Sequence, residues 1–153
     1  MAGIISQYLE PKLLDAVFGG GAAQTAWTGV ATVYIGVSTA TSPATDAALL
    51  AAEPTSAGNY SRIVVTNNAT NLTPATSSAP ATKKLHVAFS FPVSNAAWST
   101  GANALLSFFV ADAATLAGGN VLWSGPLSPA TDVVNGTGVT LTFAIDALTF
   151  TLL

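Results

Sequence analysis

The stretch TGVTLTFAIDALTFTLL, the last seventeen residues of the sequence, restricts the fold more than any other feature. Its apolar residues recur at every second position, which predicts two strands, each with one buried face. The residues between them are threonine and alanine, without lysine or glutamate. We predict that this second face lies against neighbouring protein more than against bulk water. The apolar positions are Val139, Leu141, Phe143, Ile145, Leu148, Phe150 and Leu152.

Earlier segments also have the composition of strands. Residues 103–111 are almost continuously apolar, which is typical of a central strand. In 83–91, apolar residues alternate from Leu85 to Phe91, which predicts one continuous strand. Pro126 predicts that the strand at 120–127 ends at a sheet edge. The other expected strands are 30–39 and 59–67. About seven short strands separated by turns predict a mainly β fold, an antiparallel β-sandwich of jelly-roll or Ig-like type.

A helix is expected at the N-terminal end. Apolar residues recur at helical spacing over 4–18, and Pro11 fits the first turn of a helix that begins near Glu10. Gly19–Gly21 would end it, and 46–53 is a second, shorter candidate helix. We expect one domain over 1–153, with a helix and glycine-rich cap at 1–21 and the sandwich at 28–153. The helical stripe covers its own sandwich or docks on a partner, and its candidate contact residues are Leu13, Leu14, Val17 and Phe18.

Charged residues are scarce. They make up 7% of the chain, with a net charge of −3, against about 25% in an ordinary globular domain. A neutral surface suits large contacts between subunits, because charged groups are costly to desolvate. We therefore expect a homo-oligomer or a symmetric array. Too few basic residues are present to follow a phosphate backbone, and no run is apolar and long enough to cross a bilayer, so neither nucleic acid nor membrane is an expected partner.

No set of residues suggests catalysis. Gly36–Ala40 loosely resembles the turn that carries a nucleophilic serine, but no helix pattern follows it. The one histidine, His86, lacks carboxylates at ligand spacing, and the chain has no cysteine. We predict no catalytic, metal or cofactor-binding residues, and a hydrolase is the least favoured function. Lys83, Lys84 and His86 form a small basic cluster suited to a carboxylate on a neighbouring subunit, with His86 pointing away from the core.

The aromatic residues allow two interpretations. Trp27, Trp98 and Trp123, together with Tyr34 and Tyr60, would be able to line a sugar-binding groove. Such residues are more often core or interface anchors. Trp98 and Trp123 are therefore candidate partner contacts.

The chain as a whole resembles small virion proteins of tailed bacteriophages, described as tail-fibre-like or minor tail proteins. The segments that carry the resemblance are YLEPKLLDAVFGGG, ATVYIGVST, YSRIVVTNNATN, FSFPVSNAAW and SFFVADAATLAGGNVLWSGPLSPATDVVNGTGVTLTFAIDALTFTL. The resemblance implies a β-sandwich with an N-terminal helix, a place in a virion assembled in the bacterial cytoplasm, and no catalytic residues. Similar sandwiches also serve as capsid cement or decoration proteins.

Two functions follow as hypotheses. The first is a cement or decoration subunit that binds the major capsid protein or other virion proteins and stabilises the shell. The alternative is an adhesion module of the tail or tail fibre that binds host surface glycans through the aromatic residues.

Overall fold

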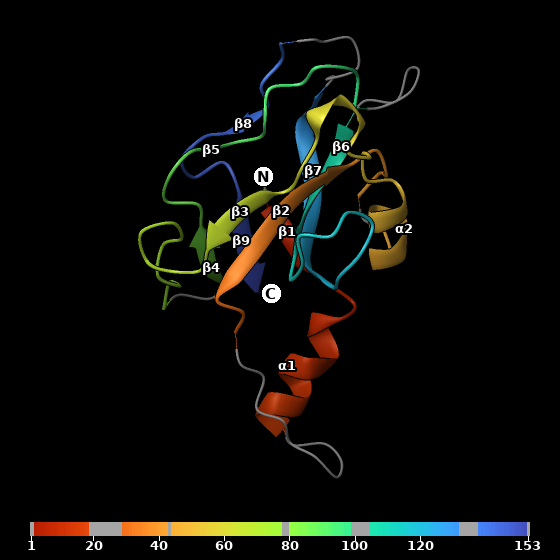
Figure 1. Cartoon of the computed structure of the whole chain (residues 1–153). Coiled ribbons are helices and arrows are strands. Elements are labelled where there is room, and N and C mark those ends of the chain that lie inside the picture. Colours follow the sequence, from red (N-terminus) through yellow and green to blue (C-terminus); the bar gives the residue numbers. More distant parts are fainter. Residues whose placement is uncertain are drawn as a thin grey trace.

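The computed structural model describes residues 2–18, 29–42, 44–77, 80–98, 105–131 and 138–152. They form a mainly β structure with a short helix after the first strand, which confirms that part of the prediction (Figure 1). The elements are β1 (Ala2–Ile5), α1 (Leu9–Phe18), β2 (Thr32–Ser38), α2 (Asp46–Ala51), the 3₁₀ turn η1 (Ala57–Asn59), β3 (Ile63–Thr66), β4 (Ala81–Lys84), β5 (Phe89–Ser90), β6 (Leu105–Ala111), β7 (Val121–Thr131), β8 (Thr142–Phe143) and β9 (Thr149–Leu152).

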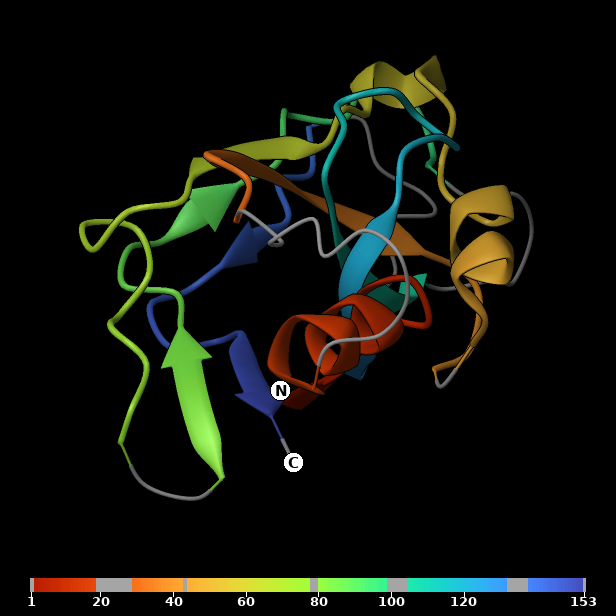
Figure 2. The same ribbon diagram turned by 90° about the horizontal axis from the view of Figure 1, so that it is seen from below.

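Seven of these strands form one sheet, in the order β3-β2-β6-β7-β1-β9-β4, and β5 pairs with β8 in a second, small sheet. Neighbours are antiparallel except β1 and β9, which run parallel. The chain beyond β3 reaches the opposite edge strand, where Leu72 forms a bridge with Leu85 and the Thr73 amide donates to the Lys84 carbonyl at 2.9 Å. The segment after β3 therefore bridges the two edges of the large sheet, which is strongly curled (Figure 2). This arrangement does not confirm a jelly-roll or Ig-like sandwich.

The sheet is covered on both faces around β6. Phe108 belongs to the main core inside the curl, together with Ile35 and Val37. Phe109 points the other way, into a second cluster with Leu49 of α2. A strand buried on both faces needs apolar residues at successive positions, so the prediction of a central strand at 103–111 is confirmed by β6.

Glycine is required where Phe109 crosses β2. A Cβ atom at Gly36 would lie 2.4 Å from Cζ of Phe109, closer than any carbon contact allows. The absence of a side chain lets the far end of the ring approach the strand, and Leu49 of α2 packs in the same cluster.

Two predictions near the N-terminus and at 83–91 are wrong. Ile4 and Ile5 do not continue the helix but form β1, which pairs with β7 and β9. Residues 83–91 do not form one strand, because β4 ends at Lys84 and β5 begins only at Phe89. Leu85 turns into the core and is fully buried, while its neighbour His86 is exposed as predicted.

Pro126 does not end its strand, which corrects another prediction. β7 runs from Val121 to Thr131 and lies between β6 and β1. Pro126 pairs with Ser107, and the register then shifts before Leu105 pairs with Thr131. Proline has no amide hydrogen to donate, and a bulge beside it explains how a strand in mid-sheet tolerates it.

The C-terminal alternation gives two strands, β8 and β9, but they do not pair with each other. β8 pairs with β5, whereas β9 lies between β1 and β4. Phe143 and Leu148 are buried as predicted, but Ile145 is 59% exposed, beside a turn in which Asp146 has φ 60°. Thr149 and Thr151 are half-buried and Thr142 is exposed. That neighbouring protein covers this face stays a prediction.

Candidate functional site

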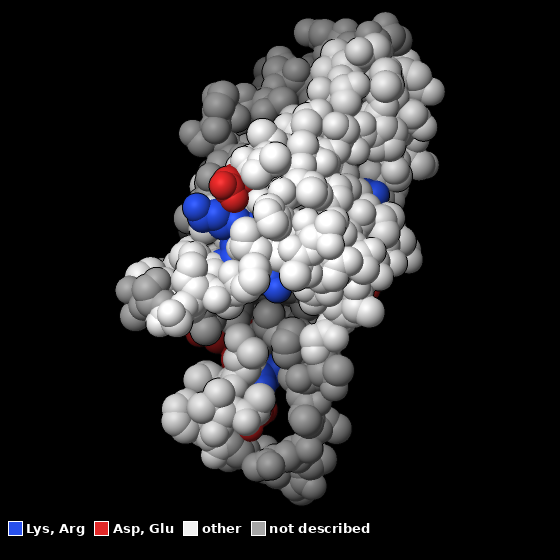
Figure 3. Space-filling view, turned by 90° about the vertical axis from the view of Figure 1, so that its left-hand side faces the viewer, with Lys and Arg blue, Asp and Glu red and all other residues white. Residues whose placement is uncertain are grey.

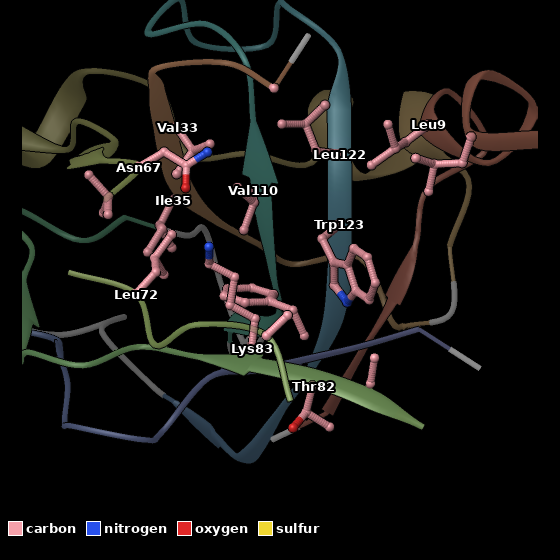
Figure 4. A pocket seen from close by; sticks show the side chains of 16 residues that line it. Leu9, Val33, Ile35, Asn67, Leu72, Thr82, Lys83, Val110, Leu122 and Trp123 are labelled. Atoms are coloured by element: carbon pink, nitrogen blue, oxygen red, sulfur yellow. The ribbon is translucent and has the colours of Figure 1, made fainter. Parts of the chain in front are cut away.

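The curled sheet and α1 line an open apolar cavity of about 400 Å³ (Figure 4). Its floor contains the buried Ile35 and Val65, and the exposed Gly29, Asn67 and Ala75 mark its mouth. Leu9 and Leu13 of α1 form one wall. The other lining residues are Val33, Leu72, Ala81, Thr82, Lys83, Val110, Leu122, Trp123 and Phe150.

A bulge in β7 shapes this cavity. Val110 pairs with Trp123 and Ala111 pairs with Val121, which leaves Leu122 without an opposite residue on β6. An extra residue in one strand re-aims the side chains beside it. Consequently Leu122 and Trp123, although adjacent, both line the cavity. The Trp123 ring also meets Phe150 edge-on, with ring centroids 6.1 Å apart.

The cavity contains few polar side chains, and Lys83 is the charged one among the described lining residues. Lys83 reaches among the apolar residues and has no ion-pair partner in the described part of the chain (Figure 4). The buried Nε1 of Trp123 has no hydrogen-bond partner among the described residues. Asn67, at the mouth, donates to the Val30 carbonyl at 3.0 Å. An occupant that brings a negative charge would pair with Lys83.

Helix α1 is fixed at its start and projects at its end. Ser6 Oγ accepts from the Leu9 amide at 3.1 Å and donates to the Val121 carbonyl, which caps the helix and ties it to β7. The Tyr8 amide donates to the Asp46 carboxylate at 3.1 Å. Beyond Leu13 the helix leaves the sheet (Figure 1).

The predicted apolar stripe is therefore divided. Leu13 is half-buried against the cavity, whereas Leu14, Val17 and Phe18 are 54%, 72% and 79% exposed. These three residues, at positions i, i+3 and i+4, share one face of the helix. We call this face the α1 tip. Gly19–Gly21, expected to end the helix, lie outside the described residues.

The structure separates the other predicted contact residues. Lys83 lines the cavity, and the half-buried Lys84 does not. His86 is exposed, with Nδ1 3.2 Å from the Ala69 carbonyl. Trp98 is only 5% exposed and packs on Tyr60 and Phe91, so it is a core residue.

One buried polar network was not predicted. Glu53 and Arg62 form an ion pair with side chains 0% and 1% exposed. Glu53 accepts from Arg62 Nε and Nη2, both at 2.7 Å, from the Tyr60 hydroxyl at 3.0 Å and from the Ala117 amide at 2.7 Å. Arg62 Nη1 donates to the carbonyls of Ala113 and Gly118. The network joins α2, β3 and the loop after β6. Each polar atom of the Glu53 and Arg62 side chains has a hydrogen-bond partner, which indicates a structural role.

Tyr60 gives this network a pH dependence. Burial, and then the negative charge of Glu53, raise the pKa of Tyr60 well above its usual value. Above about pH 10 the unfolded chain loses this proton while the folded chain keeps it. We therefore expect the free energy of unfolding to fall by up to about 1.4 kcal/mol for each further pH unit, until the folded pKa is reached.

Urea unfolding between about pH 9 and 11 measures this effect. Tyr60→Phe should flatten the decline, since phenylalanine has no proton to lose. An equal decline in both proteins would show that other groups cause it.

In the described part of the chain, no group of three or more histidine or acidic residues is placed to hold a metal ion. Neither helix among the described residues is long and apolar enough to cross a membrane.

A comparison with protein families matches residues 4–151 to the family described as Podophage GP4 fiber I protein gp80. The chain belongs to this family. The match covers nearly the whole chain, and it makes the protein a phage tail-fibre protein and a component of the virion. No curated protein matches the chain significantly.

Membership in the gp80 fibre family decides between the two functional hypotheses in part. It supports the tail-fibre alternative over the capsid cement or decoration subunit that was the first hypothesis. Composition could not make this distinction, because a charge-poor surface is equally suited to contacts in a shell or in a fibre. A fibre family also implies a structural, non-enzymatic protein whose partners are other virion proteins.

Proposed function

We propose that the chain is a non-enzymatic building block of a podophage tail fibre that joins other virion proteins through the α1 tip. The observation that carries this proposal is the exposure of Leu14, Val17 and Phe18 on a helix whose first turns, with Leu9 and Leu13, pack against the rest of the described fold. Soluble proteins rarely expose large apolar side chains side by side unless a partner covers them.

The rest of the surface supports attachment. Figure 3 shows a face on which most described residues are neither basic nor acidic. Large contacts deplete charged residues at their centres, because each buried charge must be desolvated and paired. A fibre subunit, held by neighbours along its length, is a setting in which such a surface is stable.

Glycan binding receives less support. Trp98 is buried and donates to the Gly58 carbonyl at 2.8 Å, so it cannot stack on a sugar. Trp27 lies outside the described residues, and Trp123 is half-buried beside the cavity. Adhesion to host glycans stays a prediction, which a glycan array on the purified protein tests.

The proposed function is tested by substituting apolar side chains of the α1 tip. Deletion of residues 1–21 is unsuitable, because it removes β1 from between β7 and β9. The double substitution Val17→Ser and Phe18→Ser keeps the sheet and removes the most exposed apolar side chains. We expect a folded protein whose amount in purified virions falls at least about tenfold, as for the loss of an interface hot spot.

Val64→Ser is the matched control, since Val64 is 60% exposed but lies on β3. It should enter virions at the normal level. Normal incorporation of the tip variant would contradict the proposal, as would an equal loss with Val64→Ser.

A further inference from the structure

The α1 tip projects from one end of the molecule (Figure 1), and the same helix forms part of the cavity wall through Leu9 and Leu13. We propose that the partner of the α1 tip is a second copy of this chain, which receives the tip in its cavity. This inference rests on the proposed function, because it names the partner of the same helix.

The apolar surfaces fit each other. The tip offers Val17 and Phe18, the most exposed of the large apolar side chains in the described part of the chain. The cavity offers a wall and floor of aliphatic and aromatic side chains with an exposed mouth. Insertion of the tip removes apolar surface of both copies from water, which is the main driving force of association.

The charges also fit. Asp15 is exposed on α1, three residues before Phe18, and the last turn of the helix contains no basic residue. The C-terminal end of a helix carries partial negative charge. The cavity offers Lys83, which has no ion-pair partner in the described part of the chain. Lys12, the basic residue of α1, is already placed over its own Tyr8 ring, 5.0 Å from the centroid.

The contact would be heterologous, because the tip and the cavity are different surfaces of one chain. Such contacts form a closed ring or an open filament, depending on the rotation between copies. Leu9 and Leu13 of the same helix line the cavity, so donor and acceptor surfaces are adjacent.

Mixing two defective variants tests this contact directly. Phe18→Ser disables the tip, and Ala81→Phe fills the cavity from β4. By sedimentation velocity, the original protein should form oligomers and each variant alone should be monomeric, with self-association weakened at least about tenfold. An equal mixture should form dimers and nothing larger, because one intact tip and one intact cavity remain.

Charge exchange supplies a second test that does not disturb the core. Asp15→Lys and Lys83→Glu should each weaken self-association, and the double variant should restore it to within about threefold of the original. Lys84→Glu is the control, since Lys84 does not line the cavity, and it should leave association unchanged.

The outcomes separate this inference from the proposed function. A chain that stays monomeric at all concentrations, or variants that associate like the original, would overturn the second-copy inference. If such a chain still needs Val17 and Phe18 to enter virions, the proposed function stands and the partner is another virion protein. If Ala81→Phe fails to fold, Ala75→Trp at the exposed mouth plugs the cavity instead.

Discussion

Arg62→Met should lower the free energy of unfolding by about 3–5 kcal/mol, the largest effect expected of any single substitution of a charged residue here. The substitution leaves the carboxylate of Glu53 buried without its cation, and it leaves two carbonyl groups without a donor. A buried, uncompensated charge is among the costliest defects in a protein interior. Urea or thermal unfolding monitored by circular dichroism measures the loss.

A second variant separates the charge from the packing. Glu53→Gln combined with Arg62→Met removes both charges, and the amide oxygen of the introduced side chain still accepts from the Tyr60 hydroxyl or the Ala117 amide. The double variant should recover at least about half of the loss, since removing a whole buried pair is often close to neutral. Lys84→Met, which breaks no ion pair in the described part of the chain, should change stability by less than about 0.5 kcal/mol. Equal losses for Arg62→Met and Lys84→Met would contradict the structural role of the network.

Trp98→Ala should destabilise the fold by about 3–5 kcal/mol, the range for a large aromatic side chain deleted from a core. Trp98 meets Tyr60 and Phe91 edge-on, with ring centroids 5.1 and 5.5 Å apart. The aromatic cluster continues through Phe143 to Phe108. Its loss would leave a void between the large sheet and the β5–β8 pair. Differential scanning calorimetry measures the change.

Trp98→Phe is the control for this substitution. It keeps much of the ring packing but loses the hydrogen bond from Nε1 to the Gly58 carbonyl, so we expect a loss of about 1–2 kcal/mol. An unchanged free energy of unfolding in Trp98→Ala would contradict the placement of Trp98 in the core. Reduced infectivity of Trp98→Ala should therefore be attributed to unfolding unless stability is measured in parallel.

Local patterns predicted the long periodic elements. Burial of one or both faces leaves a periodic apolar pattern that can be read from the sequence. This pattern identified the apolar run at 103–111, the strand near 30–39, the short helix at 46–53 and the helix that begins near Glu10. The four-residue strand β1 was missed. Its partners are more than a hundred residues away, and two isoleucines beside a helix fit helical spacing equally well.

The candidate site was predicted only in part. Helical spacing identified the residues of the α1 tip. It did not show that Leu13 is half-buried while the tip residues are exposed, because this difference depends on where the sheet ends. The inward position of Lys83 depends on the closure of the sheet at β4, which no local pattern encodes. A signal for the Glu53–Arg62 pair was present: the chain's one arginine stands directly before the apolar run at 63–65, where an unpaired charge would not be tolerated.

The position of β1 has a consequence for synthesis. Residues 2–5 pair with β7 and also with β9, at residues 149 and 150. At a translation rate of about 5–20 residues per second, the first strand waits about 7–30 seconds until its last neighbour has been synthesised. A nascent chain therefore cannot complete the sheet that anchors α1 before residue 150 has been made. Chains terminated before residue 150 should therefore not hold α1 in its place against the sheet. We expect few of them to be incorporated into virions.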